Sequence, residues 1–285
     1  MMRQRDNAAV RKMVKTGRCF AFWAVALLLL LFFLGPLLWM ISTAFKNYID
    51  AFALPPKIIF EPTFKNFEKV FGNADFPTYI INSIICSSAA TFLGILFGVP
   101  CAYALSVFSF KKRKQVSFFF LSLRIAPPMM SLLPMYILFN KLSLVGTRAP
   151  LLVLYTAMCV PLVVWIMPVY FRDVTSDLRE AAIIDGCSEF QVFYKIALPL
   201  VKASIAAVAI LCVVQTWNEF LIALVFTSRT SQTLPVAVTS FMTFQGTEWG
   251  PLCAAGCIIM MPTLIFGFFV QKYFARGMMS GAVKG

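Results

Sequence analysis

The sequence predicts an all-α, polytopic membrane protein with six transmembrane helices and both termini in the cytoplasm, and three observations support this prediction. The chain is strongly apolar, with a mean hydropathy of +0.82 and hydrophobic residues at 60% of its positions. Only 13% of its residues are charged, whereas ordinary globular chains carry roughly 25%. Long apolar runs recur along the chain, and lysine and arginine gather in alternate segments between them.

Six apolar stretches are long enough for a helix across a bilayer core of about 30 Å, which takes about 20 residues. They lie near residues 19–41, 80–108, 117–140, 151–171, 203–226 and 251–274. We expect a basic cytoplasmic N-terminus at residues 1–18 and one transmembrane domain over residues 19–285. The first stretch is longer than the apolar part of a signal peptide and no A-x-A cleavage site follows it, so we expect an uncleaved signal anchor.

The distribution of lysine and arginine sets the predicted orientation, because cytoplasmic loops are enriched in both. Seventeen of the 25 basic residues precede the first stretch, separate the second from the third, lie between the fourth and fifth, or close the chain from Lys272 onward. Seven lie in the other connecting segments, and Arg124 lies inside the third stretch. This asymmetry places both termini and the segment between the fourth and fifth stretches in the cytoplasm. It also accounts for the net charge of +13 without a nucleic-acid partner.

Proline marks both the first outer loop and the spans. In the loop, about residues 42–79, Pro55, Pro56 and Pro62 favour extended or turning backbone, and the following TFKNFEKVF spaces its phenylalanines along one face of a short surface helix. Several apolar stretches also contain proline, which tends to kink a helix, among them Pro100, Pro127, Pro128, Pro134, Pro161, Pro168 and Pro262. These kinks indicate either a solute path or the general frequency of proline in membrane helices.

One cytoplasmic segment, EAAIIDGCSEFQVFYKIALP at residues 180–199, is polar and carries helix-capping signals. Asp177 followed three residues later by Glu180 is a capping pattern for a helix over residues 178–185. Gly186 is a natural residue to end that helix.

A second capping box follows, because Ser188 precedes Gln191 by three residues and predicts a helix over residues 189–198. A simple connection between two spans needs neither helix. The segment is therefore predicted either to dock another protein or to rest on the membrane surface.

The sequence contains none of the common catalytic constellations. Histidine is absent, which removes the H-E-x-x-H zinc motif and the Ser-His-Asp triad. The phosphate-binding pattern G-x-x-x-x-G-K-[ST] is missing as well. The eight cysteines form no C-x-x-C pair, and seven lie in or beside apolar stretches, where thiols behave as small hydrophobic groups. No enzyme, metal site or cofactor is therefore predicted.

The polar segment resembles the EAA loop of ABC importer permeases, in which E-A-A is followed by a glycine six residues after the glutamate and then by I-x-L-P. Seven positions match in order and at fixed spacing: Glu180, Ala181, Ala182, Gly186, Ile196, Leu198 and Pro199. Further stretches resemble the carbohydrate-uptake members of this family, and more specifically the smaller permease of the maltose transporter. They are PLLWMISTAFK, YIINSI, IDGCSEFQVFYKIALPL, WNEFLIALVF, TLPVAV and GAVKG, and they extend over nearly the whole chain.

The resemblance implies a multi-pass permease of the cytoplasmic (inner) membrane that pairs with a homologous second permease. Two separate ATP-binding subunits would hydrolyse ATP, and an extracytoplasmic solute-binding protein would deliver a sugar, oligosaccharide or polyol. The loop around residues 228–250 would contact that binding protein. The coupling helices would dock on an ATP-binding subunit through Glu180, Ala181, Ala182, Asp185, Gly186, Ile196, Leu198 and Pro199.

Two charged residues, Glu219 and Arg124, lie within predicted spans, where a charge is costly and marks function by default. Glu219, with Trp217 and Asn218, is predicted either to line the solute path or to make a structural hydrogen bond. Arg124 is a further candidate for the path, or it extends its long side chain toward the cytoplasm. The two charges lie at different depths along their spans, so a direct ion pair is not expected.

An ion-coupled secondary transporter is the alternative function. It should show inverted repeats and several coupling-ion acids within the spans, whereas the spans contain one acid, Glu219, and no repeat. A membrane scaffold or receptor would not need the EAA spacing and should bring a signalling domain.

Overall fold

The computed structural model describes residues 2–244 and 246–282, with side chains from residue 19 to residue 269 except those at positions 20, 21, 128, 173–177 and 245. These residues are helical apart from turns and two short strands, β1 (Met242–Thr243) and β2 (Gly246–Thr247), which confirms the all-helical prediction. They group into two compact units, described separately below. The small unit comprises residues 1–70 and 245–257, and the main unit comprises residues 71–244 and 258–285.

Among the described residues, four helices are long and apolar enough to cross a membrane, and two bent helix pairs raise the number to six at most. The four are α1 (Met2–Ala44), α4 (Phe76–Val107), α7 (Ala149–Ile184) and α13 (Trp249–Ala282). The chain is therefore polytopic. The exact number of six spans, their orientation and the domain boundary at residue 19 remain predictions.

In the small unit, α1 is followed by α2 (Tyr48–Ala51) and α3 (Lys65–Phe71), so the predicted short helix after the proline-rich loop is present. The large apolar side chains of α1 from Phe22 to Trp39 are exposed. Such a surface is expected of a helix that contacts lipid or another chain rather than its own core.

Lys46 organises the end of α1. Its side chain is buried, and its Nζ lies 4.1 Å from the ring centroid of Trp39 and 5.2 Å from that of Phe60. These are cation–π distances. Asn66 of α3 donates from Nδ2 to the carbonyl oxygens of Ala44 (2.9 Å) and Lys46 (2.7 Å), which fixes α3 against the end of α1.

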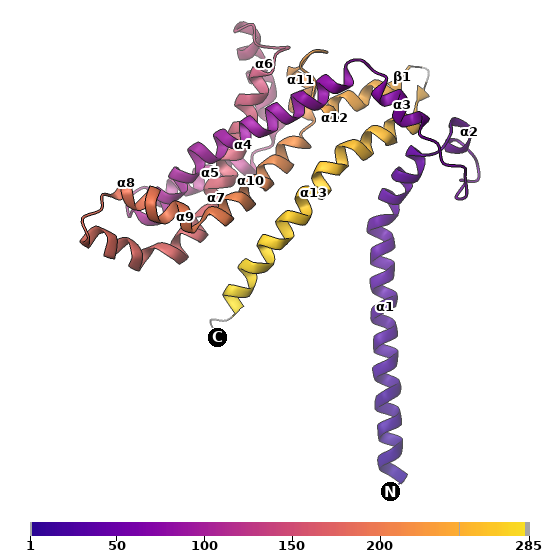
Figure 1. Ribbon diagram of the computed structural model, residues 1–285, viewed down its shortest axis with the longest axis horizontal. Helices are drawn as coiled ribbons and strands as arrows, with labels where there is room; N and C mark the ends of the chain where they lie inside the picture. Colours follow the sequence, from indigo (N-terminus) through magenta and orange to yellow (C-terminus); the bar gives the residue numbers. More distant parts are fainter. Residues whose placement is uncertain (1, 245, 283–285) are drawn as a thin grey trace. The chain divides into compact units, whose positions relative to one another are not determined.

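The main unit is built around α4, α7 and α10 (Lys202–Trp217), which pack against one another (Figure 1). Two glycines of α4 lie directly against α7. A Cβ added to Gly94 would lie 2.4 Å from the Cβ of Cys159, and one added to Gly98 would lie 2.7 Å from the Cβ of Val163. Small residues let membrane helices approach closely, and Gly94 and Gly98 allow this approach between α4 and α7.

The third predicted span, residues 117–140, is not one straight helix, and the prolines within it had predicted a kink. The chain forms α5 (Arg113–Ile125) and α6 (Pro128–Lys141), bent by 90° at the break. Ala126 and Pro127 each precede a proline and adopt ψ of 127° and 126°. A residue before proline is pushed away from the helical region, so two successive prolines end one helix and begin another.

The fifth predicted span, residues 203–226, is also interrupted. α10 ends at Trp217, and α11 (Leu221–Phe226) begins after a three-residue break. Two further short helices follow, α12 (Leu234–Ala237) and the 3₁₀ helix η2 (Val238–Phe241).

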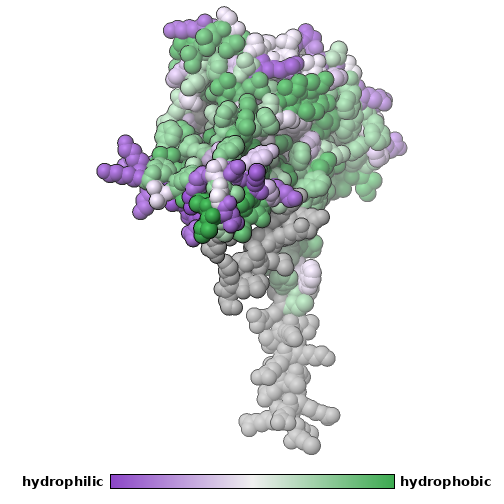
Figure 2. Space-filling model, turned by 60° about the vertical axis from the view of Figure 1, so that its left-hand side comes forward, coloured by the Kyte–Doolittle hydropathy of each residue, from purple (hydrophilic) through white to green (hydrophobic). Residues whose placement is uncertain are grey.

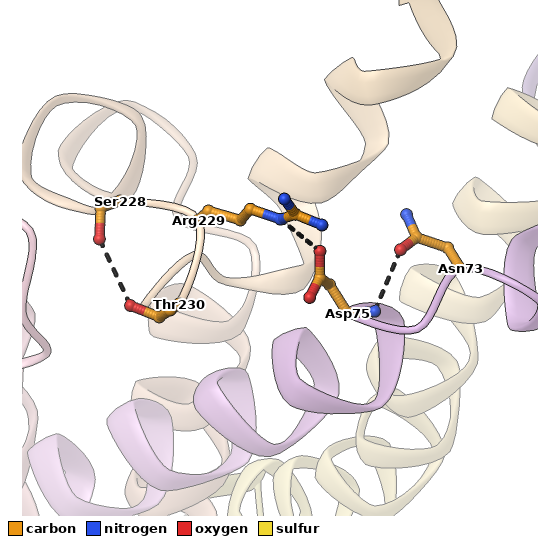
Figure 3. A network of polar contacts seen from close by, with 5 residues as sticks. All are labelled: Asn73, Asp75, Ser228, Arg229 and Thr230. Atoms are coloured by element: carbon orange, nitrogen blue, oxygen red, sulfur yellow. Dashed lines mark hydrogen bonds and ion pairs between the residues drawn. The ribbon is translucent and has the colours of Figure 1, made fainter.

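The loop after α11 is fixed to the N-terminal end of α4 (Figure 3). Arg229 donates from Nε to Oδ2 of Asp75 at 2.6 Å, and the Asp75 N–H donates to Oδ1 of Asn73 at 3.0 Å. Deeper in the unit, Asn82 donates from Nδ2 to the carbonyl oxygens of Thr230 (3.1 Å) and Gln232 (2.8 Å). One end of α4 is therefore tied to a segment about 150 residues later in the chain.

Hydrophobic residues, green in Figure 2, cover most of the described surface on the face shown, and hydrophilic residues gather in separate groups. Large aromatic side chains of the main unit are exposed, among them Phe92, Phe97, Phe118 and Phe119. Soluble monomers rarely expose apolar surface on this scale.

Candidate functional site

The EAA segment, residues 178–200, begins on α7 rather than on a helix of its own. α7 runs without interruption from Ala149 to Ile184, so Asp177 lies inside it and the predicted N-terminal cap at this residue is wrong. A capping pattern starts a helix only where the preceding backbone is not already helical. Here the fourth predicted span continues as a helix into the polar segment.

The predicted end of this helix at Gly186 is confirmed. Gly186 has φ of +87°, its N–H donates to the carbonyl of Ile183 at 3.0 Å, and the N–H of Cys187 donates to the carbonyl of Ala182 at 2.9 Å. This pair of bonds is a Schellman motif, which satisfies the last carbonyls of a helix. No described atom lies within 4 Å of a Cβ built on Gly186, so the requirement for glycine comes from its backbone conformation.

The second capping box is also confirmed. The Gln191 N–H donates to Oγ of Ser188 at 3.3 Å, and the Ser188 N–H donates to Oε1 of Gln191 at 2.8 Å. The helix that follows changes type along its length: α8 (Glu189–Gln191), the π-helix η1 (Val192–Ala197) and α9 (Leu198–Leu200). A π-helical turn is rare and frequently marks a functional site. The chain then bends by 74° into α10.

The EAA residues lie on both sides of the Gly186 turn. Ala182 is 7% exposed and packs inward, whereas Glu180, Ala181, Asp185 and Gly186 are exposed. On the far side of the turn, Ile196 and Leu198 are half-buried and Pro199 is exposed.

Large apolar side chains project from the same segment. Ile184 is 85% exposed and Phe190 is 75% exposed, and Leu178, Ile183 and Tyr194 are exposed as well. We call these five residues the apolar patch. Each of the five is a large apolar side chain that the described part of the chain leaves exposed on a segment held by capping hydrogen bonds.

One ion pair of this segment had not been predicted. Arg179 donates from Nε to Oε2 of Glu189 at 3.1 Å, and its Nη2 donates to Oε1 of the same carboxylate. These hydrogen bonds raise the pKa of Arg179 above its usual value. The two residues stand ten positions apart on opposite sides of the Gly186 turn, and only the spacing across a predicted turn could have indicated the pair.

Three of the four candidate solute-path residues lie at the break between α10 and α11, with Trp217 as the last residue of α10 and Asn218 and Glu219 in the break. Glu219 is bound within the chain. Its carboxylate accepts hydrogen bonds from the Ile222 N–H (2.9 Å), the Ala223 N–H (3.2 Å) and the Tyr155 hydroxyl (3.2 Å). A carboxylate at the first turn of a helix satisfies N–H groups that lack a partner. Glu219 therefore caps α11 and connects it to α7.

Trp217 is buried and donates from Nε1 to the carbonyl of Ile259 at 3.0 Å. It also lines a cavity of about 340 Å³ whose other walls are largely apolar. Ser87 lies in the same wall, and its buried hydroxyl has no hydrogen-bond partner among the described residues.

Asn218 is the exposed polar residue of the break. It donates from Nδ2 to the Val214 carbonyl (2.8 Å) and to the Thr263 hydroxyl (3.1 Å). The fourth candidate, Arg124, lies apart from these residues in the chain, exposed in the last turn of α5. A cation there interacts favourably with the helix C-terminus, and Arg124 is absent from the ion pairs found among the described residues.

Comparison with known proteins matches most of the chain to the permease family that its sequence motifs resemble. Residues 94–280 match the family described as "Binding-protein-dependent transport system inner membrane component". The chain is 37% identical to the probable ABC transporter permease protein y4oR of Sinorhizobium fredii, over 92% of this chain and 94% of that protein. It is 33% identical to the trehalose/maltose transport system permease protein MalG of Thermococcus litoralis, over 91% and 95%.

The fold is shared with a solved bacterial ABC transporter involved in the import of the acidic polysaccharide alginate. The superposition has a TM-score of 0.74 and covers 90% of this chain and 97% of the other, at 22% sequence identity.

Proposed function

Because the chain belongs to the family of binding-protein-dependent transport system inner membrane components, we propose that it forms part of the channel through which an ABC importer moves a sugar, oligosaccharide or polyol. It is a multi-pass permease of the inner membrane and not itself an enzyme. Its partners in this proposal are a homologous second permease, two ATP-binding subunits and an extracytoplasmic solute-binding protein. The relative named as a permease of a trehalose/maltose transport system supports a carbohydrate as the solute.

The apolar patch is the observation that carries the docking part of this proposal. Ile184 and Phe190 lie on opposite sides of the Gly186 turn, and both are exposed on a segment held by two sets of capping bonds. A rigid, apolar projection suits a groove on another protein, because little conformational entropy is lost when it binds. We propose that the patch, with Glu180 and Ala181 beside it, enters a groove of the ATP-binding subunit.

Asn218 carries the solute-path part. It is exposed, and its amide pairs with Thr263 rather than with a charged group. Amide and hydroxyl groups can exchange such bonds for hydrogen bonds to the hydroxyls of a sugar. Glu219 and Trp217 fix the backbone at the break through their hydrogen bonds to the Tyr155 hydroxyl and the Ile259 carbonyl.

The docking test uses a single cysteine at Ile184, with Cys187 and the other native cysteines replaced. Benzophenone maleimide attached there, in membranes of the native host, should label a protein whose peptides contain the G-x-x-x-x-G-K-[ST] sequence. A cysteine at the buried Ala182 is the matched control and should give little adduct. Labelling of lipid alone from Ile184 would contradict docking.

The energy source separates the proposal from an ion-coupled transporter. In whole cells, uptake of the solute should survive a protonophore while cellular ATP is maintained, and it should stop when ATP is depleted. Loss of uptake with the protonophore at constant ATP would favour the ion-coupled alternative.

A further inference from the structure

The turn at Gly186 joins the two halves of the EAA segment and has few contacts of its own. Asp185 and Gly186 are exposed, and no described atom lies within 4 Å of a Cβ built on the glycine. The two backbone bonds of its Schellman motif fix the turn locally, but no side-chain packing from the described residues supports it at Gly186 against a force on the apolar patch. The angle between α7 and α8 under such a force therefore depends on other contacts.

The ion pair of Arg179 with Glu189 crosses the turn and supplies one such contact. Both guanidinium nitrogens involved donate to the same carboxylate. A bidentate arginine–carboxylate pair fixes orientation as well as distance. The pair therefore holds the first residue of α8 against the last turns of α7.

The same pair lies against the C-terminal end of α4. The Arg179 guanidinium carbon is 5.8 Å from the ring centroid of Phe108, which follows α4. Tyr103, near the end of α4, is buried, and its ring centroid lies 4.9 Å from that of Phe193 in η1 and 5.3 Å from that of Phe171 in α7. The Tyr103 ring therefore lies against η1, in the second half of the EAA segment, and against α7, the helix whose last turns form the first half.

A crevice beside α4 limits the packing between this helix and the second half of the EAA segment. A crevice of about 310 Å³ lies between α4 and the second half of the segment, lined by Tyr103, Phe108, Glu189 and Phe190 among others. Because the crevice leaves this side unpacked, the ring contacts of Tyr103 and the ion pair join the segment to α4 there.

We propose that Arg179 is a positioning residue: by binding Glu189 next to the rings of Tyr103 and Phe108, it makes both halves of the EAA segment move together with α4. The inference rests on the proposed docking of this segment on an ATP-binding subunit. Without the pair, a movement of the docked subunit would be absorbed by bending at Gly186.

The test is charge reversal in the complete transporter, reconstituted with its binding protein in liposomes. Arg179→Glu and Glu189→Arg should each lower the amount of solute moved per ATP hydrolysed, by roughly fivefold or more, while the ATP-binding subunit stays bound. The double variant R179E/E189R should restore the ratio to within about twofold of the unaltered chain. Arg172→Glu is the matched control, because Arg172 is an exposed residue of the same helix that makes no ion pair with the residues described, and its ratio should not change.

Tyr103 gives a second arm that changes no charge. Tyr103→Phe keeps the ring that lies against Phe171 and Phe193 and should keep the ratio, whereas Tyr103→Ala removes the ring and should lower the ratio as far as Arg179→Glu does.

Three results would overturn the proposal. They are unchanged ratios in both single reversals, a double reversal as poor as either single one, or loss of the ATP-binding subunit from the single variants. The last result would make the pair part of the docking surface itself. In each case the labelling test at Ile184 stands separately, so failure of this inference is distinguishable from failure of the proposed function.

Discussion

The Cβ position of Gly94 lies 2.4 Å from the Cβ of Cys159, well inside the contact distance of two carbon atoms. Because Cβ is fixed to the backbone, neither helix can relieve this contact by changing a rotamer. Gly94→Ala should therefore push α4 and α7 apart and lower the free energy of unfolding by about 1–3 kcal/mol, as other overpacked cores do. Thermal unfolding of the purified protein in detergent measures the change.

Two second-site variants make that experiment specific. Cys159→Gly removes the clashing atom and should rescue Gly94→Ala, whereas Cys159→Ala keeps its Cβ and should not. Gly267→Ala is the control, since no described atom lies within 4 Å of that position. Equal melting temperatures for Gly94→Ala and Gly267→Ala would contradict the close approach of the two helices.

At Gly186 the expected effect depends on φ rather than on space. A non-glycine residue in the left-handed region costs roughly 1–2 kcal/mol, and asparagine tolerates it better than other residues. Gly186→Val should therefore lower ATP-driven uptake strongly and Gly186→Asn only slightly, at equal amounts of protein in the membrane. Equal uptake in the two variants would show that the left-handed turn is not needed.

Glu219 should behave as a structural group. Glu219→Gln and Tyr155→Phe each remove part of one hydrogen-bonded set, and each should lower the free energy of unfolding by about 1–2 kcal/mol. Their effects should not add, because the same bond is lost in both variants. Thermal unfolding of the two single variants and the double variant measures this, alongside the concentration of solute that gives half-maximal uptake. A shift in that concentration without a loss of stability would place Glu219 in the solute path.

At the N-terminal end of α4, the buried hydrogen bonds of Asn82 should contribute more to stability than the exposed ion pair of Arg229 with Asp75. Arg229 is 80% exposed in its ion pair with Asp75, and exposed pairs contribute about 0–1 kcal/mol. Asn82 is fully buried and serves two backbone carbonyls. Replacing it with alanine would leave both carbonyls without that partner, at a cost of about 1–3 kcal/mol. The melting temperature should therefore fall more for Asn82→Ala than for Arg229→Ala, and the reverse order would refute this ranking.

The features that could be predicted from the sequence are the local ones. Gly186 and the Ser188–Gln191 box involve residues within a few positions of one another, so their patterns alone specify the caps. Asp177 fitted the same pattern and was wrong, because the helix of the fourth span was already propagating through it.

The contacts between distant segments could not be predicted, because they depend on the tertiary arrangement rather than on a local sequence pattern. The Arg179–Glu189 pair depends on how the chain turns back at Gly186, and the Tyr103 ring cluster depends on how α4 packs against α7. Adjacent prolines at 127 and 128 indicated a kink in the third span, but the 90° angle results from the backbone conformation of two successive residues. The membrane placement of these elements and the role of each candidate site residue remain predictions to be tested.

The length of α4 gives the joint at Tyr103 a mechanical meaning. The helix has 32 residues, which at 1.5 Å each makes a rod about 48 Å long. It packs closely against α7 near its middle, at Gly94 and Gly98. Its N-terminal end is bound to the loop that contains Arg229. A rod of this length that tilts by about 5° as a whole displaces one end by about 4 Å relative to the other. A small displacement of α4 at Tyr103 would thus move the loop at the opposite end of the helix, with no hydrogen bond inside the helix broken.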